Sequence, residues 1–270
     1  MIKPVLHAFL LVIVSITLVS IKSTAQLSLL KKQNLSGISG IKADPLGNYY
    51  LYNRSAIFKY NLSDTLFSRY SELQYGSLSG LDVSNPMKLT LHYAEVSMVV
   101  FLDNTLNPTF TPTNLYEVGL ETAILVCSSY DNGFWAFDAP SFSLSRINSF
   151  GEVDRQVKNI NQLTGLDIHP TQMLEKENQL YLYDPAAGIF LFDIFGGYLK
   201  KWPLTGFQTF SVDRKQLYYC KNNKLYQFDT KLFKENEMNL PVDGVLDAVV
   251  EKDRLYILSQ SGILFIYKLG

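Results

Sequence analysis

Three aspartates stand where carboxylates from different strands could converge on a metal ion. Asp82, Asp167 and Asp213 each lie near the start of an apolar, strand-like run. Oxygen ligands gathered in this way bind calcium, and the bound ion can activate water for hydrolysis. The first of the matching runs has Lys42 in place of an acid, and the third has Leu125. Because this set offers too few oxygen ligands, we expect Asp82, Asp167 and Lys42 to line a polar channel and predict no bound metal ion.

Other catalytic groups are sparse. Beyond residue 25 the histidines are His92 and His169, and neither has a cysteine or carboxylate at the spacing of a zinc site. The sequence contains no Gly-x-Ser-x-Gly, no His-Glu-x-x-His and no phosphate-binding glycine loop. Cys127 and Cys220 lie in apolar runs and are expected to be buried free thiols. We therefore predict no enzyme activity, no catalytic residue and no cofactor.

Composition and charge exclude two further classes. The 270 residues are 47% hydrophobic and 13% aromatic, which is too apolar for a disordered chain. The formal net charge of −1 gives no basis for nucleic-acid binding.

The first 25 residues have the pattern of a secretory signal peptide. Lys3 is followed by the apolar run Val5–Val19, and Ser23-Thr24-Ala25 places small residues at a cleavage site. We predict cleavage after Ala25, a single domain over residues 26–270 and no membrane span in the cleaved chain. The expected location is the periplasm, or an association with the outer membrane.

A repeat of roughly forty residues organises the rest of the chain. Each unit has a short strand, a turn, a run of alternating aromatic and aliphatic residues, a second turn and a further strand. The strand starts are Ser39-Gly40-Ile41, Ser79-Gly80-Leu81, Thr122-Ala123-Ile124, Thr164-Gly165-Leu166, Gln208-Thr209-Phe210 and Asp247-Ala248-Val249. Six such units predict an all-β fold, a six-bladed β-propeller. The last unit stops after its third strand, so we expect the segment beginning Gln26-Leu27-Ser28 to complete the last blade and close the ring.

The segment Tyr183–Gly196 resembles the blades of NHL and YWTD propellers. It contains Asp184, Ile189, Phe192-Asp193 and Gly196 in the cadence D-x-x-x-x-I-x-x-F-D-x-x-G. With its Gln26 start and its Tyr- and Phe-rich composition, the chain also resembles small exported envelope propellers, among them the plug subunit of the type IX secretion translocon. That resemblance implies a role at the periplasmic mouth of an outer-membrane channel.

The best available interpretation is a non-catalytic propeller that binds a protein partner as a monomer within a complex. Aromatic side chains supply much of the energy of protein interfaces. Four of them fall at expected blade edges and are the interface candidates: Trp202, Tyr198, Phe142 and Phe150. Two alternatives stay open, a calcium-dependent lactonase-like hydrolase and a glycan-binding propeller.

Overall fold

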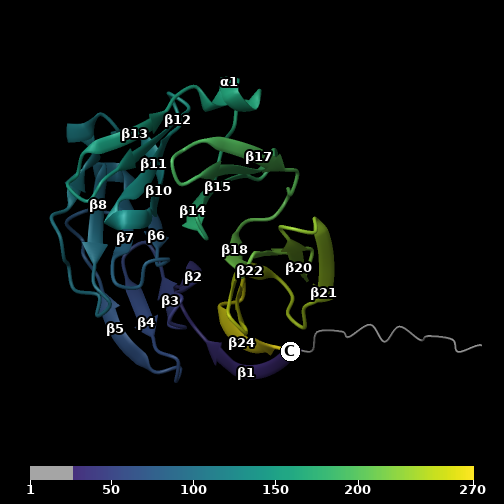
Figure 1. Ribbon diagram of the computed structural model, residues 1–270. Helices are drawn as coiled ribbons and strands as arrows, with labels where there is room; N and C mark the ends of the chain where they lie inside the picture. The colour runs from purple at the N-terminus through teal and green to yellow at the C-terminus, as the bar shows by residue number, and fades with distance from the viewer. Residues whose placement is uncertain (1–26) are drawn as a thin grey trace, which may run out of the picture.

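The computed structural model describes residues 27–270, which form six sheets arranged in a ring around a central axis (Figure 1). The predicted signal peptide, residues 1–25, lies outside the described residues. Each sheet has four antiparallel strands, from an inner strand beside the axis to an outer strand at the perimeter. The predicted all-β six-bladed propeller is therefore confirmed.

The blades follow one another in chain order. Blade 1 contains β2 (Gly40–Ala43), β3 (Tyr49–Tyr52), β4 (Ile57–Tyr60) and β5 (Leu66–Tyr70), and blade 2 contains β6 (Gly80–Asp82), β7 (Leu89–Tyr93), β8 (Met98–Leu102) and β9 (Thr113–Asn114). Blade 3 contains β10 (Ala123–Ser128), β11 (Phe134–Asp138), β12 (Ser143–Ile147) and β13 (Val153–Val157). Blade 4 contains β14 (Gln172–Lys176), β15 (Gln179–Asp184), β16 (Gly188–Asp193) and β17 (Tyr198–Trp202). Blade 5 contains β18 (Phe210–Asp213), β19 (Gln216–Lys221), β20 (Lys224–Asp229) and β21 (Lys234–Asn239).

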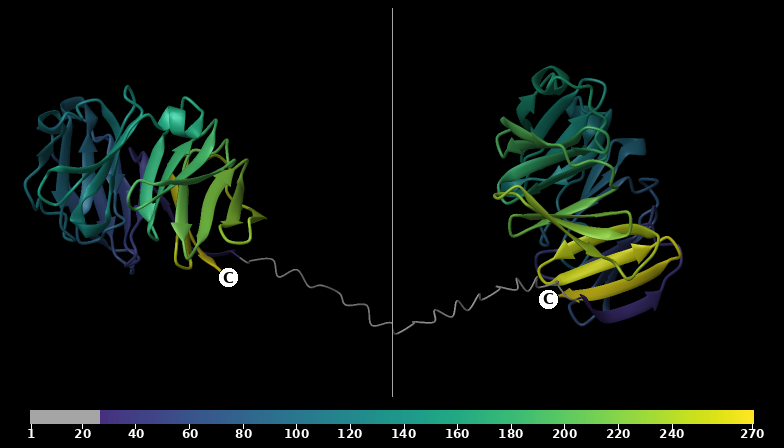
Figure 2. Two further views of the ribbon diagram at one scale, coloured as in Figure 1. Left: turned by 45° about the horizontal axis from the view of Figure 1, so that its top comes forward. Right: turned by 90° about the vertical axis from the view of Figure 1, so that its right-hand side faces the viewer.

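Blade 6 joins the two ends of the described chain. Its strands β22 (Val245–Glu251), β23 (Arg254–Ser259) and β24 (Ile263–Leu269) are completed by β1 (Leu27–Asn34), which pairs antiparallel with β24. Leu27 lies opposite Leu269, and Asn34 lies opposite Ile263. The right-hand view of Figure 2 shows β1, in purple, along the edge of the yellow strands. This pairing is the predicted closure, and it protects the outer edge of β24.

The two ends of the propeller differ in the connections they carry. In each antiparallel blade the turn from the first to the second strand and the turn from the third to the fourth strand lie at one end, here called the hairpin face. The opposite end, the crossover face, carries the remaining turns and the connections between blades. It includes η1 (Ala94–Val96), η2 (Leu115–Val118) and α1 (Ile160–Thr164), whereas η3 (Tyr130–Asn132) belongs to the hairpin face. No helix within residues 27–270 combines the length and apolar character needed to cross a bilayer.

The turns from the third to the fourth strand share one local structure. In blades 1 to 5 the Oδ1 atom of an Asn or Asp accepts two backbone N–H groups of the turn, at Asn61, Asp103, Asn148, Asp193 and Asp229. Asx turns of this kind hold the backbone in a defined loop. The turn tips therefore point exposed apolar side chains outward at Leu62, Phe150, Phe195, Leu232 and Phe233.

Apolar contacts between neighbouring blades form the core. Between blades 4 and 5, for example, Tyr183, Phe207 and Tyr219 stack with ring centroids 4.2 Å apart at each step, and Tyr226 continues the row at 5.0 Å. The alternation of the strands sends every second side chain into such an inter-blade layer. Burial between blades explains why the repeat is rich in Tyr and Phe.

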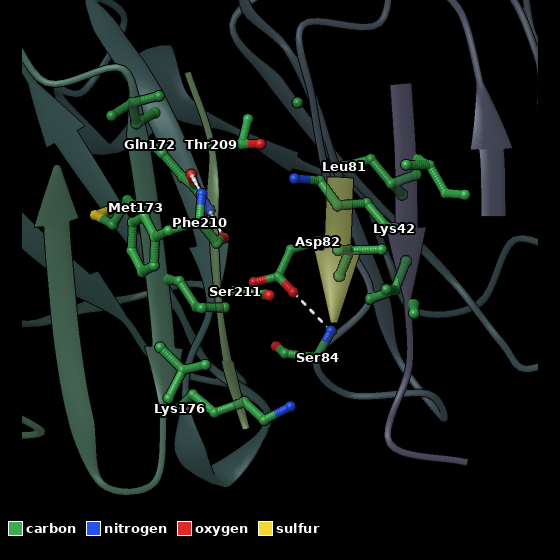
Figure 3. A pocket seen from close by; sticks show the side chains of 18 of the residues that line it. Lys42, Leu81, Asp82, Ser84, Gln172, Met173, Lys176, Thr209, Phe210 and Ser211 are labelled. Atoms are coloured by element: carbon green, nitrogen blue, oxygen red, sulfur yellow. Dashed lines mark hydrogen bonds between the residues drawn. The ribbon is translucent and has the colours of Figure 1, made fainter. Parts of the chain in front are cut away.

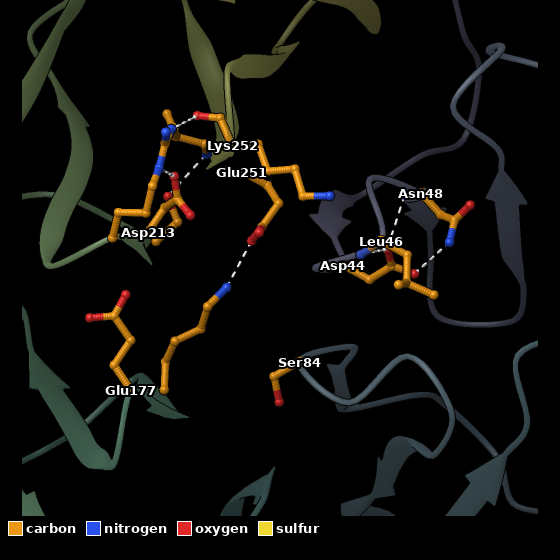
Figure 4. A network of polar contacts seen from close by, with 12 residues as sticks. Asp44, Leu46, Asn48, Ser84, Glu177, Asp213, Glu251 and Lys252 are labelled. Carbon is orange, nitrogen blue, oxygen red and sulfur yellow. Dashed lines mark hydrogen bonds and ion pairs between the residues drawn. The ribbon is translucent and has the colours of Figure 1, made fainter.

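Polar contacts on the hairpin face join each blade to the next around the whole ring. They run from Lys59 to the Asn104 carbonyl, from Lys88 to the Asn132 carbonyl, from Tyr130 N–H to Glu175, from Lys215 N–H to Glu177, from Arg214 to the Lys252 carbonyl and from Arg254 to the Leu62 carbonyl. Figure 4 shows part of this circuit around Asp213 and Lys252. Because every junction has such a contact, the loops of this face are positioned relative to one another.

Candidate functional site

The inner strands of all six blades surround a central cavity of about 230 Å³ (Figure 3). Lys42 of β2 and Asp82 of β6 line it, together with polar side chains that include Gln172, Thr209 and Ser211. Enclosed spaces on the axis of a propeller are the usual places for small ligands. The cavity is therefore the first candidate site.

The carboxylates around this cavity are already used to join blades. Asp82 accepts the Ser84 N–H at 2.7 Å within its own blade and the Ser128 N–H of blade 3 at 2.8 Å. Asp247 accepts the Ile41 N–H of blade 1 at 2.9 Å and the Thr209 hydroxyl at 2.8 Å. Since these oxygens satisfy buried backbone donors, the two acids act as staples between blades.

Asp167 does not reach the cavity, so its predicted place was wrong. It is exposed in the loop after α1, where its Oδ1 atom accepts a hydrogen bond from Asn161 at 3.3 Å. The inner strand of blade 4 is β14, which begins only at Gln172. Among residues 27–270 no group of three or more His, Cys, Asp or Glu side chains is placed to hold a metal ion. The calcium-dependent hydrolase therefore has no ligand set in the described part of the chain.

Lys42 is a cation of the cavity with charged and polar neighbours around it. Burial lowers its pKa, but the electrostatic influence of Tyr52, Asp247 and Asp82 outweighs that effect, so the pKa of Lys42 is raised. No hydrogen bond within residues 27–270 contributes to this shift. The amine is thus a protonated donor facing an enclosed space.

A second lysine at the hairpin end of the cavity is paired. Lys176, the last residue of β14, lies 2.8 Å from Glu251, the last residue of β22. A dashed line marks the ion pair of Glu251 in Figure 4. Burial raises the pKa of the Glu251 carboxyl, although Lys176 acts in the opposite direction. The ion pair connects blades 4 and 6 past blade 5, so its charge is neutralised within the protein.

The four predicted interface aromatics lie in different environments. Trp202 is only 3% exposed and packs against Tyr181 and Phe228, with centroid distances of 6.2 and 5.4 Å. Its predicted role at a surface was wrong, because the outer strand β17 turns this side chain toward blade 5. Tyr198 and Phe142 are half-buried against the core cluster of blades 3 and 4. Phe150 is 86% exposed at the tip of its turn.

Phe150 borders a groove between blades 2 and 3 that is the second candidate site. The groove has a volume of about 460 Å³ and is lined by Phe101, Phe110, Phe134, Phe150 and Lys88, among others. Phe101 and Phe134 are buried in its floor, and Phe110 is 56% exposed on its side. A concave, aromatic surface of this kind is typical of protein-binding sites.

A desolvated cation lies in this groove. The Lys88 ammonium lies 4.0 Å from the ring centre of Phe101 and 4.7 Å from that of Phe110, and it donates to the Asn132 carbonyl. Burial lowers the pKa of Lys88 to about 8. Two aromatic faces and one carbonyl thus replace much of the hydration of this amine.

The sequence analysis missed Phe110, although a signal is present. Pro108 and Pro112 interrupt the outer strand of blade 2, because proline cannot donate to a strand ladder. β9 is consequently reduced to Thr113–Asn114, and the intervening segment bulges outward with Phe110 at a φ of +50°. A bulky residue in this left-handed region is strained, and such residues are frequent at binding sites.

Comparison with known proteins supports the fold without defining a family. No family model and no curated protein matches the chain. A streptogramin B lyase structure matches with a TM-score of 0.62 at 12% identity, covering 90% of this chain and 98% of that one. A catalytically inactive variant of virginiamycin B lyase from Staphylococcus aureus, solved with quinupristin, matches with a TM-score of 0.61 at 12% identity, covering 91% and 100%. The structure of BBS1N in complex with ARL6DN matches with a TM-score of 0.55 at 13% identity, covering 84% and 78%. The fold and its channel thus define a six-bladed β-propeller, and the finer NHL or YWTD likeness stays a resemblance.

The lyase structures correct the prediction that this protein is not an enzyme. That prediction depended on the lack of a recognisable catalytic motif. However, the streptogramin B lyases, whose fold is similar to that of this chain, are enzymes. The motif argument was therefore wrong. At 12% identity the likeness concerns the fold and assigns no activity to this chain. The two histidines among residues 27–270 lie outside the central cavity, since His92 is buried in β7 and His169 is exposed before β14.

Proposed function

We propose that this protein is a docking propeller of the cell envelope that binds a protein partner in the groove between blades 2 and 3. The observation that carries the proposal is the concave group of Phe101, Phe110 and Phe150 around the desolvated Lys88. An outer-membrane channel is the class of partner that the sequence resemblance implies.

The chemistry of the groove specifies what the partner segment should contain. The exposed rings of Phe150 and Phe110 are suited to contact an apolar side chain of the partner. Lys88 keeps a positive charge at neutral pH, since its pKa is about 8, and this favours a neighbouring carboxylate. The expected ligand is therefore a segment with an apolar anchor next to an acidic residue. A solved propeller of similar fold, BBS1N, is in complex with ARL6DN, which is consistent with such a use.

The experiment is a comparison of affinity purifications from detergent-solubilised envelopes of the source organism. Phe150→Ser and Phe110→Ser should each reduce the recovery of a stoichiometric partner by about tenfold, the usual effect of an interface anchor. Leu73→Ser and Leu163→Ser are the matched controls, because both residues are exposed on the crossover face. Equal recovery by all four variants, with each shown to be folded by circular dichroism, would refute docking in the groove.

A second candidate function is the binding or conversion of an anionic small molecule in the central cavity. The protonated Lys42 amine favours it, and the fold is similar to that of a streptogramin B lyase. The test is calorimetric titration of small carboxylates, followed by chromatography of the mixture for any product. A real site should lose its signal in Lys42→Met, and an identical signal in that variant would exclude a role for this amine.

A further inference from the structure

The hairpin face has an uneven distribution of charge. Blade 5 contributes exposed basic residues at Arg214, Lys215, Lys231 and Lys234, and blade 6 adds Lys252. Exposed Glu235 and Asp253 lie beside them, and Arg214 is paired with Asp213. The hairpin turns of blades 3 and 4 instead carry exposed Asp131, Glu152 and Glu177. The basic side chains and the apolar tip Leu232-Phe233 together form the surface here called the basic corner.

An apolar tip projects from the middle of the basic corner. Leu232 is 74% exposed and Phe233 is 60% exposed, and they stand between Lys231 and Lys234 in the sequence. The Asp229 side chain holds the turn by accepting the N–H groups of Lys231 and Leu232, each at 2.8 Å. A rigid tip with two large apolar side chains and flanking lysines has the chemistry of a segment that inserts at a membrane interface.

The entry point of the chain lies on the same face. Leu27 pairs with Leu269 at the end of β24, so the chain enters the propeller beside its C-terminus on the hairpin face (Figure 1). Leu29 and Leu30, at 54% and 48% exposure, follow directly on blade 6, next to blade 5. Two further exposed apolar side chains therefore lie near the entry point of the chain, on the face that carries the basic corner.

We propose that the basic corner seats the propeller on an anionic lipid surface, with Leu232 and Phe233 entering the interface and the surrounding lysines contacting headgroups. The lysines should make the protein prefer anionic to zwitterionic lipid, because each lysine near an anionic surface strengthens binding about fivefold. The acidic turns of blades 3 and 4 are repelled by the same surface, which sets the tilt of the ring.

The test is vesicle flotation of the chain that begins at Gln26, since residues 27–270 supply every strand of the six sheets. We expect binding to vesicles containing about 30% phosphatidylglycerol, little binding to pure phosphatidylcholine, and loss of binding at high salt. Lys231→Glu with Lys234→Glu should weaken binding by at least about 25-fold. Leu232→Ser with Phe233→Ser should weaken it by at least about tenfold. The exposed Leu73→Ser on the crossover face is the control and should have no effect.

A second measurement separates insertion from loose adsorption. Tryptophan placed by Phe233→Trp should shift its emission to the blue and be quenched by brominated lipid on anionic vesicles, whereas Leu73→Trp should do neither. The proposal would be overturned by a lack of vesicle binding or by equal binding to both lipids. It would also be overturned by equal quenching in the Phe233→Trp and Leu73→Trp variants. Because none of these readouts involves the groove, failure here leaves the proposed protein docking untouched.

Discussion

Replacing Asp247 by alanine should destabilise the ring, because this side chain joins three blades. It is 7% exposed, and it accepts hydrogen bonds from the Ile41 N–H of blade 1 and the Thr209 hydroxyl of blade 5. Each hydrogen bond to a buried charged acceptor contributes about 1.5–3 kcal/mol, partly offset by the cost of burying the carboxylate. We expect a net loss of about 3 kcal/mol, which for a domain of this size lowers Tm by about 6–12 °C.

The assay is thermal unfolding of matched variants by circular dichroism and calorimetry. Asp167→Ala removes an exposed loop carboxylate and should change stability by less than about 0.5 kcal/mol. Asp247→Asn keeps one oxygen acceptor, so its effect should lie between the two alanine variants. If Asp247→Ala and Asp167→Ala had the same Tm, the idea of a staple between blades would be refuted. If Asp247→Ala were more stable than the native protein, Asp247 would instead be a strained functional group.

Three further predictions test the packing. Burial lowers the pKa of His92 from 6.5 to about 4, so the unfolded chain binds more protons than the folded chain in that range. The contribution of His92 to the free energy of unfolding should be complete above pH 6.5 and should fall by up to about 3 kcal/mol toward pH 4. In His92→Leu, the difference between the urea midpoints at about pH 7 and 4.5 should therefore be smaller. Trp202→Ala should cost about 3–5 kcal/mol in urea unfolding, more than Tyr198→Ala, because only Trp202 is fully buried. Gly188→Ala should cost about 3 kcal/mol by calorimetry, because φ is +114° and a Cβ atom would lie 2.2 Å from the Trp202 carbonyl oxygen.

The architecture was predictable because local sequence patterns specify its strands and turns. Strands with alternating aromatic and aliphatic residues, separated by Asx and glycine turns, define the blades without any long-range information. The pattern misled at one blade, where Gly165 ends α1 with a φ of +71° instead of starting an inner strand. A small residue before an apolar one marks a strand start at Gly40 and Gly80 but a helix end at Gly165, and the difference lies in the Asn159–Thr164 turn that precedes it.

The candidate site was predictable only in part, because its contacts join distant residues. Lys42 and Asp82 belong to inner strands that line the cavity. The partner of Asp247, however, is 206 residues away in sequence, so no spacing rule could reveal it as a staple. The same holds for Trp202, whose burial depends on Phe228 of the next blade.

The face on which an exposed turn residue lies could be predicted, because the strand topology alone determines it. In a four-stranded antiparallel blade the first and third turns always lie at the same end, whatever the sequence of the turns. Once six blades are inferred, Phe150, Phe195 and Phe233 must therefore share one face, since each belongs to a turn between third and fourth strands. Solvent exposure of these three rings follows from the Asx turns that hold their loops. A surface of this kind can thus be derived from the repeat before any coordinates exist, whereas a channel site requires knowing which distant donor satisfies each acid.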